Sequence, residues 1–412
     1  MKIPHNIYMV GIGGIGMSAL AQLLKYQGKE MGGSDREESP VTDMLKRQGF
    51  KVFFGHSAEN ISNNTELLIY SDAVPEDNLE RVAARKKDIS ECSYFQALGE
   101  VSKKYRTVAV AGTHGKTTTA AMLATILKAA EKEPTAIIGS VVNEWGSNFL
   151  AGRSNVLVVE ACEYKKHFLE FRPEVLVVTN VEWDHTDYYK TPEEFEAAFA
   201  EARKQAKKVI EKDEYAKELV PELLLPGEFN RDNACAAKSG ARAMFPELPD
   251  TVADEALRNF KGVWRRFEYK GKTKEGDLVY DDYAHHPTAI RKTLEAARVK
   301  FPDKKIIVAF HPHLYTRTRD LMNDFAHVLS LADEVVIAPI YAAREEPVAG
   351  VTSEALAKRI SALGVPAKAL SSSHDVYMYL TTNYELQSTN RLIITMGAGD
   401  IYKVADRLVA GT

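Results

Sequence analysis

Short apolar runs alternate with longer segments of helical periodicity along the whole chain. The apolar runs are nearly continuous, as in parallel strands that are buried on both faces of a sheet. They span residues 7–10, 67–70, 107–110, 156–159, 175–179, 306–310, 335–338 and 392–395. Several end in polar residues, and the carboxyl ends of parallel strands are where open α/β sheets bind ligands. The pattern therefore predicts an α/β protein with ligand sites at strand ends.

Two interruptions divide this alternation. A polar stretch covers residues 99–106, and a second break at residues 262–264 precedes a new set of strands. With the usual domain size, they predict three modules: 1–104, 105–262 and 263–412. The stretch 197–222 is rich in Ala, Lys and Glu, which predicts an exposed helical segment.

The composition of the chain indicates which classes of protein it can belong to. The 412 residues are 45% hydrophobic and 27% charged, with a formal net charge of -4, as in a soluble globular protein with no general reason to bind nucleic acid. No run is long enough to span a bilayer. Cys92, Cys162 and Cys235 are scattered along the chain, which fits a reducing compartment better than a disulfide framework. We therefore expect a cytoplasmic protein without nucleic-acid partners or membrane insertion.

The most informative segment reads AGTHGKTTT, from Ala111 to Thr119. It lies between an apolar strand and an Ala/Leu/Met-rich helix, which is the anatomy of a phosphate-binding loop. Backbone N–H groups and the helix N-terminus would hold an anion, Lys116 would neutralise the outer phosphates, and a Thr hydroxyl would reach Mg²⁺. The first Gly of the strict pattern falls at Val110, and the alternative is a glycine turn that binds nothing.

A second glycine turn, GIGGIG, covers Gly11 to Gly16, and Asp35 follows at the distance of a ribose-binding carboxylate. Such a turn can hold any diphosphate, or can serve helix packing alone. Since a separate phosphate loop also exists, a nucleotide-linked substrate plus ATP explains both turns better than one nicotinamide cofactor.

Polar residues after the central strands complete the first set of candidates. Glu160 ends a buried strand, where it could hold Mg²⁺ or form a salt bridge. His185 follows the next strand and could be a second metal ligand or a structural residue. Asn230 and Asn233 share one helical face and could read adenine or ribose, or cap the helix.

Three segments of the last module carry further candidates. Arg266 could stabilise a transferring phosphoryl group or belong to a solvated Arg pair. Asp282, His285 and His286 are dense enough to indicate a site. The cations of residues 311–319 suit a carboxylate. Residues 396–401 form a third glycine turn, which we interpret as structural support.

Taken together, the motifs resemble the Mur ligase family of peptidoglycan synthesis, and the ordered set covers nearly the whole chain. The matching pieces are GIGGIGMSAL, YSDAVPEDN, AGTHGKTTT, VVEACEYKKHF, TNVEWDH, PGEFNRDNA, RRFE, DDYAHHPT, FHPHLYTRT and TMGAGDI. GIGGIGM and DDYAHHPT favour the branch that adds the first amino acid. The resemblance implies a three-domain α/β architecture, with Rossmann-like N- and C-terminal domains and a central P-loop ATPase domain.

The resemblance also implies roles for matching positions and two cofactors, ATP and Mg²⁺. The UDP-sugar residues would be Gly11, Ile12, Gly13, Gly14, Ile15, Gly16, Asp35 and Ser71. The ATP residues would be Gly112, Thr113, His114, Gly115, Lys116, Thr117, Thr118, Asn230, Asn233, Arg266 and Asp282. The metal ligands would be Thr117, Glu160 and His185, the amino-acid residues His285 and Arg317, and the catalytic residues Lys116, Arg266 and His285.

The implied reaction is ATP-dependent amide formation between UDP-N-acetylmuramate and L-alanine through an acyl phosphate, by a monomer or homodimer. Two departures stand out. Leu314 replaces an Arg that many members carry, and the interval 186–226 is short, with strands of the central sheet missing. Leu314 leaves open a related ligase that attaches a recycled tripeptide, and the short interval leaves open an inactive nucleotide-binding module. A nicotinamide-dependent dehydrogenase would leave Lys116 and Arg266 without a role.

Overall fold

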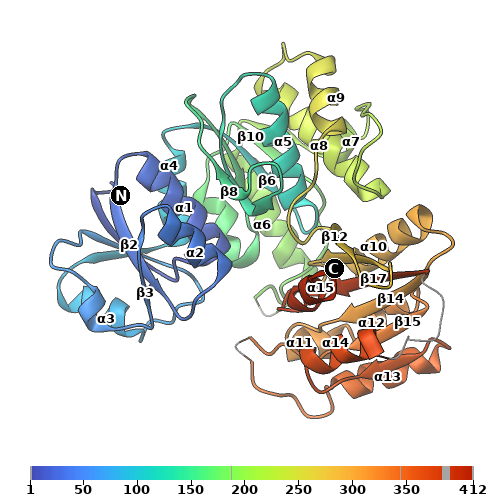
Figure 1. The fold of residues 1–412 in the computed structure, drawn as a ribbon. Coiled ribbons are helices and arrows are strands. Elements are labelled where there is room, and N and C mark those ends of the chain that lie inside the picture. The colour runs from blue at the N-terminus through green and yellow to red at the C-terminus, as the bar shows by residue number, and fades with distance from the viewer. Residues whose placement is uncertain (1, 187, 344, 383–389, 411–412) are drawn as a thin grey trace. The chain divides into compact units, whose positions relative to one another are not determined.

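The computed structural model describes residues 2–186, 188–343, 345–382 and 390–410. Three α/β sheets follow one another along the chain (Figure 1). They belong to two compact units: residues 1–222 with 232–261, and residues 223–231 with 262–412. The first unit holds two of the sheets and the second unit holds one, which confirms an α/β architecture with one sheet in each predicted module. The exact boundaries 1–104, 105–262 and 263–412 stay predictions.

The first sheet has five parallel strands in the order β3-β2-β1-β4-β5. Its strands are β1 (Asn6–Val10), β2 (Glu30–Asp35), β3 (Lys51–Phe54), β4 (Leu67–Tyr70) and β5 (Ser90–Ser93). Its helices are α1 (Ile15–Tyr26), α2 (Pro40–Arg47), α3 (Leu79–Lys86) and α4 (Tyr94–Ser102), with the 3-10 turn η1 (Ala58–Asn60). The order reverses beside β1, so the glycine turn after β1 lies where doubly wound sheets bind ligands.

The second sheet has the order β11-β10-β6-β9-β7-β8 and is parallel except for the β7–β8 hairpin. Its strands are β6 (Arg106–Ala111), β7 (Thr135–Val142), β8 (Ser147–Leu150), β9 (Val156–Glu160), β10 (Val175–Val178) and β11 (Lys208–Ile210). Its helices are α5 (Lys116–Ala129), α6 (Pro192–Gln205), α7 (Lys212–Tyr215), α8 (Glu228–Met244) and α9 (Asp250–Arg258), with the 3-10 segment η2 (Tyr164–Glu170). Helix α5 is buried from Thr117 to Leu127, which explains why this stretch contains no charged residue.

The expectation of one exposed helix over 197–222 is wrong. Helix α6 ends at Gln205, strand β11 pairs with β10, and α7 follows. Phe199 and Ala202 of α6 are buried. The Val-Ile pair of β11 extends the sheet by one short strand that begins with Lys208, as edge strands often do to discourage further pairing.

The second unit is built on the sheet β12-β13-β17-β14-β15-β16, in which only the β12–β13 pair is antiparallel. Its strands are β12 (Glu268–Lys272), β13 (Leu278–Asp282), β14 (Lys305–Phe310), β15 (Glu334–Ile337), β16 (Ala367–Ala369) and β17 (Arg391–Met396). Its helices are α10 (Pro287–Lys300), α11 (Tyr315–Asp320), α12 (Met322–Leu329), α13 (Ser353–Ala362), α14 (Ser373–Thr382) and α15 (Tyr402–Val409). Buried apolar residues pack on both faces of this sheet.

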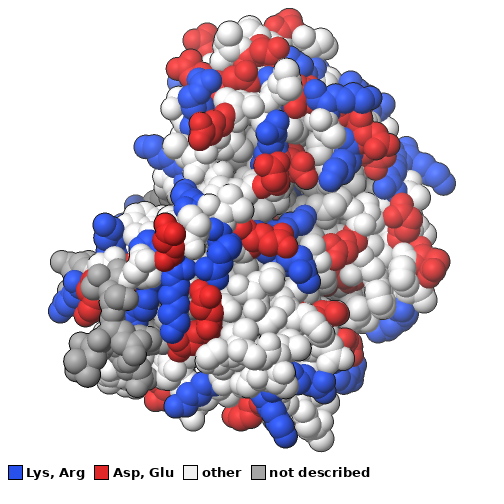
Figure 2. All heavy atoms as spheres, turned by 90° about the vertical axis from the view of Figure 1, so that its right-hand side faces the viewer, with Lys and Arg blue, Asp and Glu red and all other residues white. Residues whose placement is uncertain are grey.

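The distribution of charge on the surface and the length and polarity of the helices agree with the composition. Lys and Arg are interspersed with Asp and Glu on the face drawn in Figure 2. Within the described part of the chain, every helix is too short or too polar to cross a bilayer.

Candidate functional site

The turn after β1 needs its glycines for steric reasons. Gly11 has a φ of 81°, and a Cβ on it would lie 3.0 Å from Cβ of Ser71. The N–H of Gly13 donates to Oδ2 of Asp35 at 2.8 Å, and a Cβ on Gly16 would lie 2.7 Å from the ring of Tyr94. The structure thus brings the predicted residues Asp35 and Ser71 to this turn. Ile12, Gly14 and Ile15 complete it.

The loop between β6 and α5 has two glycines that no other residue could replace without displacement. Gly112 has a φ of 135°, and a Cβ there would lie 2.1 Å from Oγ1 of Thr179. Gly115 has a φ of 83°, and a Cβ there would lie 2.2 Å from Oδ1 of Asn233. Asn233 of α8 therefore packs directly against the loop, as expected for one of the predicted ATP residues.

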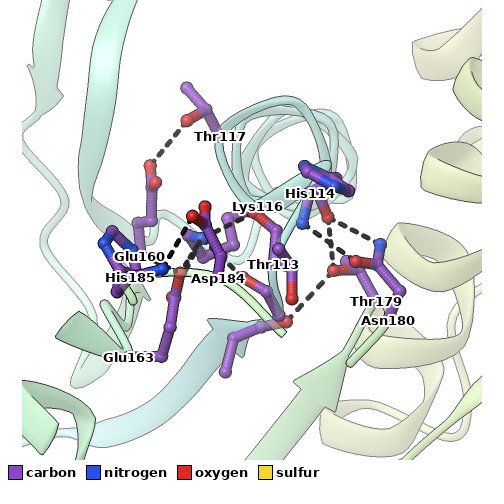
Figure 3. A network of polar contacts seen from close by, with 12 residues as sticks. Thr113, His114, Lys116, Thr117, Glu160, Glu163, Thr179, Asn180, Asp184 and His185 are labelled. Atoms are coloured by element: carbon purple, nitrogen blue, oxygen red, sulfur yellow. Dashed lines mark hydrogen bonds and ion pairs between the residues drawn. The ribbon is translucent and has the colours of Figure 1, made fainter. Parts of the chain in front are cut away.

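Polar groups after β10 fix the path of this loop (Figure 3). The N–H of Thr113 donates to the carbonyl of Asn180 at 3.0 Å. The N–H of His114 donates to the side chain of Asn180 at 2.9 Å, and that side chain donates back to the carbonyl of His114 at 2.9 Å. Thr113 also accepts from the N–H of Glu182 at 2.8 Å. Contacts within the protein therefore fix the path of the loop.

Lys116 points back over the loop from the first turn of α5 (Figure 3). Its Nζ donates to the carbonyl oxygens of Gly112 at 2.5 Å and Thr113 at 3.1 Å. It also lies 2.9 Å from Oε2 of Glu163, whose side chain is 1% exposed. The ammonium is thus already at the loop and is balanced by one buried carboxylate.

This pair shifts both pKa values toward the charged forms. Burial disfavours the ammonium of Lys116, but the neighbouring acidic groups, Glu163 foremost, together outweigh burial and raise the pKa of Lys116. Burial likewise opposes ionisation of Glu163, but the charge of Lys116 and a hydrogen bond from His185 lower the pKa of that carboxyl. The neighbouring thiol of Cys162 is inert, because burial raises its pKa to about 12.

Two predicted metal ligands meet beside this loop. Oγ1 of Thr117 donates to Oε2 of Glu160 at 2.9 Å, and the N–H of Gly139 donates to the same oxygen at 2.9 Å. The third predicted ligand, His185, lies 3.3 Å from Oε1 of Glu163. A hydroxyl and carboxylates are the oxygen donors that Mg²⁺ prefers, so Thr117 and Glu160 fit that ion. An imidazole suits it less well.

Asp282 ends β13 in the second unit and is held from two sides. Its Oδ1 accepts the N–H of Ala284 at 3.0 Å, and its Oδ2 accepts the hydroxyl of Thr293 at 2.6 Å. Burial raises the pKa of Asp282 to about 6, against the opposing effects of Thr293 and Arg266. At neutral pH the carboxylate is ionised but costly to bury, which favours a cationic partner.

The two neighbouring arginines have different environments. Arg265 is buried, donates to Asp281 at 2.8 Å and binds the carbonyls of Gly397 and Gly399 at 2.5 and 2.8 Å. It therefore supports the third glycine turn. Arg266 is partly exposed and lies 5.1 Å from the ring centroid of Tyr283. Of the two, Arg266 is the one that is not fully buried, and a ligand-binding residue has to be accessible.

The predicted amino-acid residues lie among aromatic side chains of the second unit. Nδ1 of His285 is 3.0 Å from the carbonyl of Tyr283. A carbonyl accepts only, so this contact places the proton of a neutral imidazole on Nδ1 and makes Nε2 the basic nitrogen. The ring of His285 lies 6.0 Å from that of His313, which stacks on Tyr341 at 5.7 Å. Arg317 is 9% exposed in α11.

Nδ2 of Asn230 donates to the carbonyl of Pro226 at 2.7 Å, which connects the first turn of α8 to the segment before it. This bond does not cap the helix, because a capping side chain accepts a helix N–H. His286 does cap its helix, because its side chain accepts the N–H of Thr288 at the start of α10. The proposed ATP contact of Asn230 stays a prediction.

Three Mur ligase domain models match the chain in order. The family's catalytic domain covers residues 6–106, the middle domain 110–223 and the glutamate ligase domain 265–399. The chain belongs to the Mur ligase family.

The chain is similar to known ligases over nearly the full length of both sequences. UDP-N-acetylmuramate–L-alanine ligase of Clostridium acetobutylicum is 36% identical, covering 99% of this chain and 98% of that protein. The ligase of the same name from Desulfitobacterium hafniense is 38% identical, covering 99% and 100%. The first alignment spans 457 positions, although this chain has 412 residues, so that relative carries segments that this Mur ligase lacks.

Solved structures superpose on this chain over nearly its full length. The UDP-N-acetylmuramate–alanine ligase MurC of Thermotoga maritima superposes with a TM-score of 0.81 at 30% identity, covering 98% of each chain. A murein peptide ligase of Psychrobacter arcticus has a TM-score of 0.71 at 23% identity, covering 99% of this chain and 98% of that one, and shows the shared fold alone. The domain matches and the Thermotoga maritima structure confirm the predicted three-domain architecture, and the L-alanine ligases of similar sequence confirm the ATP-dependent ligase class.

Glu163 is the site residue that the sequence analysis of this Mur ligase missed. It stands three residues after Glu160, in a segment already singled out. The sequence feature that could have indicated Glu163 is a second carboxylate shortly after the end of a strand. Its pairing with Lys116 spans 47 residues of sequence and can be seen only in the structure.

Proposed function

We propose that this chain joins L-alanine to UDP-N-acetylmuramate in an ATP-dependent reaction of peptidoglycan synthesis. The observation that carries the proposal is the pair of glycine turns in the first unit. One turn presents Lys116 beside Thr117 and Glu160, and the other is bound to Asp35. Full-length similarity to L-alanine ligases supports this substrate pair over the tripeptide ligase.

The chemistry follows from the poor reactivity of a carboxylate, whose leaving group would be oxide. An oxygen of the lactyl carboxylate attacks the γ-phosphorus of ATP, ADP leaves, and an acyl phosphate forms. The neutral amine of alanine then attacks the acyl carbon, and inorganic phosphate departs with the C–O bond electrons. Positioning and charge stabilisation supply most of the acceleration in such transfers.

We assign Lys116 and Arg266 to the charge that develops on the transferring phosphoryl group. Nε2 of His285 would accept the proton that the amine loses. Thr117 and Glu160, with His185, would hold Mg²⁺, which neutralises phosphate charge when bound. Oxygen donors at Thr117 and Glu160 support this assignment.

The remaining assignments follow the family resemblance. The UDP-sugar would bind Gly11 to Gly16 with Asp35 and Ser71. The other ATP residues would be Gly112, Thr113, His114, Gly115, Thr118, Asn230, Asn233 and Asp282. Arg317 would bind the amino-acid carboxylate. We also infer a cytoplasmic enzyme, monomeric or homodimeric, that has no nucleic-acid partner.

Leu314 is the position that most affects the choice of amino acid. It lies between His313 and Tyr315, is 8% exposed, and has a φ of 67°. Its N–H donates to the carbonyl of Tyr341 at 2.9 Å. Because Leu314 carries no charge, Arg317 is the residue of this segment that we assign to the amino-acid carboxylate.

The test is phosphate release with UDP-N-acetylmuramate and a panel of alanine, serine, glycine and the tripeptide. We expect release to require both the UDP-sugar and alanine. Lys116→Ala should abolish it, while Lys128→Ala, an exposed lysine on the same helix, should not. Turnover that survives Lys116→Ala would disprove the ATP site, and equal use of the whole panel would disprove an alanine-specific pocket.

A further inference from the structure

The segment from Glu160 to Phe168 connects the phosphate loop with the sheet that carries the other glycine turn. Near its start, Glu160 and Glu163 contact Thr117 and Lys116 (Figure 3). Near its end, the ring of His167 forms an ion pair with Asp72. Asp72 directly follows Ser71 at the end of β4. The segment therefore spans the interval between the two proposed nucleotide sites.

Aromatic packing fixes the far end of this segment. The ring of His167 stacks on Phe95 of α4, with centroids 3.9 Å apart and planes at 11°. Burial raises the pKa of Asp72, but the hydrogen bond from His167 and the charges of His167 and Lys165 outweigh it, so the pKa is lowered. Asp72 is therefore an ionised anchor for the segment, and Lys165 is close enough to affect it.

Between these two anchors the backbone makes an unusual turn. Lys165 and Lys166 have φ values of 50° and 61°, both in the left-handed region. Two consecutive residues with side chains rarely adopt this conformation, and glycine would adopt it without strain. Such strain persists where the surrounding structure imposes it, and it clusters at functional sites.

The surroundings do impose this turn. The N–H of Lys166 donates to the carbonyl of Glu163 at 3.0 Å, and the N–H of Phe168 donates to that of Cys162 at 2.8 Å. The hydroxyl of Tyr189 donates to the carbonyl of Glu163 at 2.5 Å. Both lysine side chains are exposed, and neither is in a salt bridge with a described residue. The turn thus fixes the place where two exposed lysine side chains leave the backbone.

The proposed reaction needs positive charge at this place. A carboxylate must approach the γ-phosphate, and both groups are anionic, so their approach is opposed unless cations offset the repulsion. Lys116 is already paired with Glu163. The ring of Tyr164, next to Lys165, lies 4.8 Å from that of His185, so the turn adjoins the phosphate end of the site.

We propose that Lys165 and Lys166 bind the lactyl carboxylate of the UDP-sugar and hold it for phosphorylation. The inference rests on the proposed function and adds two substrate-binding residues to it. His167 is then a positioning residue, which keeps the turn in register with β4 through Asp72 and Phe95. This binding role of the ammonium groups explains why lysine occupies two positions where glycine would be less strained.

The decisive variant is the double change Lys165→Gly with Lys166→Gly. It removes both charges and relieves the backbone strain, so the thermal midpoint should stay the same or rise. We expect the KM for UDP-N-acetylmuramate to rise roughly tenfold or more, as for loss of charge-assisted contacts. The KM values for ATP and alanine should stay unchanged. Lys165→Arg with Lys166→Arg keeps both charges and should retain most of the affinity.

UDP-N-acetylglucosamine provides the comparison ligand, because it lacks the lactyl group, including its carboxylate, and is otherwise the same molecule. Its inhibition constant should be the same for the wild type and the glycine variant. Asp88→Gly provides the matched backbone control, since Asp88 has a φ of 54° in an exposed turn. It should raise the thermal midpoint without changing any KM.

Different results would refute the proposed function and the role of the two lysines. A wild type that releases no phosphate with UDP-N-acetylmuramate and alanine would refute the proposed function. An active wild type with an unchanged KM in the glycine variant would refute only the role of the lysines. Equal weakening of both UDP-sugars would also refute it, since the lost contact would then lie away from the carboxylate.

Discussion

Glu163→Gln is the perturbation that probes the buried charge pair at the phosphate loop. The change keeps the shape of the side chain and removes its charge. In the structure Lys116 would then keep its contacts with the carbonyls of Gly112 and Thr113 but lose its anion. We expect the protein without ligands to be clearly less stable, because a buried cation is left uncompensated.

The magnitude follows from distance and burial. At 2.9 Å between Nζ of Lys116 and Oε2 of Glu163, the Coulomb attraction is about 6 kcal/mol at an effective dielectric constant of about 20. Desolvation of both groups offsets much of it, but breaking a buried pair from one side costs about 3–5 kcal/mol. Glutamine can still accept a hydrogen bond from Lys116, so we expect a loss near the lower end, about 3 kcal/mol.

The assay is urea unfolding followed by tryptophan fluorescence in a Trp264→Phe background, which leaves Trp145 and Trp183 of the first unit as reporters. The measurement is repeated with saturating ATP in EDTA. Phosphate then supplies the anion for Lys116, so the difference between wild type and variant should shrink. By linkage, ATP should bind the variant more tightly than the wild type by the same free energy.

The control is Glu196→Gln, which removes the charge from an exposed pair with Arg203 at 2.7 Å. Such pairs contribute about 0–1 kcal/mol, and ATP should not alter that small effect. A Glu163→Gln loss as small as the control, or one that ATP leaves unchanged, would contradict the view that Glu163 substitutes for phosphate.

Two further predictions address other parts of the fold. Burial raises the pKa of Asp282 to about 6, above its unfolded value, so the folded state binds the extra proton and stability should fall as the pH rises from about 4 to about 6. Asp282→Asn should flatten that slope and gain up to about 3 kcal/mol above pH 7; an unchanged slope in pH-dependent unfolding would contradict this origin. Gly115→Ala should weaken ATP binding at least tenfold, roughly the effect of one displaced charge-assisted contact, because its Cβ would lie 2.2 Å from Oδ1 of Asn233. Gly146→Ala, with a φ of 60° and no atom within 4 Å of its Cβ, should leave ATP affinity by calorimetry unchanged, and equal losses in both variants would indicate backbone strain alone.

The buried parallel strands could be predicted because their signal is local. Strand β4 has the predicted bounds, and β6 and β9 extend the predicted runs by a residue or two. Strand β2 could not be found in this way, since its sequence EMGGSD is neither apolar nor alternating. It is a strand because β1 and β3 pair with it on both sides, a non-local cause that periodicity does not contain.

The same distinction applies to the site. Glycine, lysine and threonine in a strand-turn-helix context report backbone requirements that are local, so the phosphate loop could be read directly from the sequence. The functional difference between Arg265 and Arg266 could not, because it depends on whether the side chain meets Asp281 and the turn at Gly397 and Gly399. Neighbouring residues of the same type can be given different roles only once the fold shows which of them is buried.

The β7–β8 hairpin explains how two glycine turns far apart in sequence can be kept in a fixed relation. In β7, the N–H of Gly139 donates to Glu160 beside the phosphate loop at 2.9 Å. In β8, Nδ2 of Asn148 donates to the carbonyl of Ile15 in the other glycine turn at 2.5 Å. Since β7 also pairs with β9, which carries Glu160, one hydrogen-bonded element touches both turns. In-line transfer needs reacting atoms about 3–3.5 Å apart, and a ladder of strands maintains such a distance better than a flexible loop would.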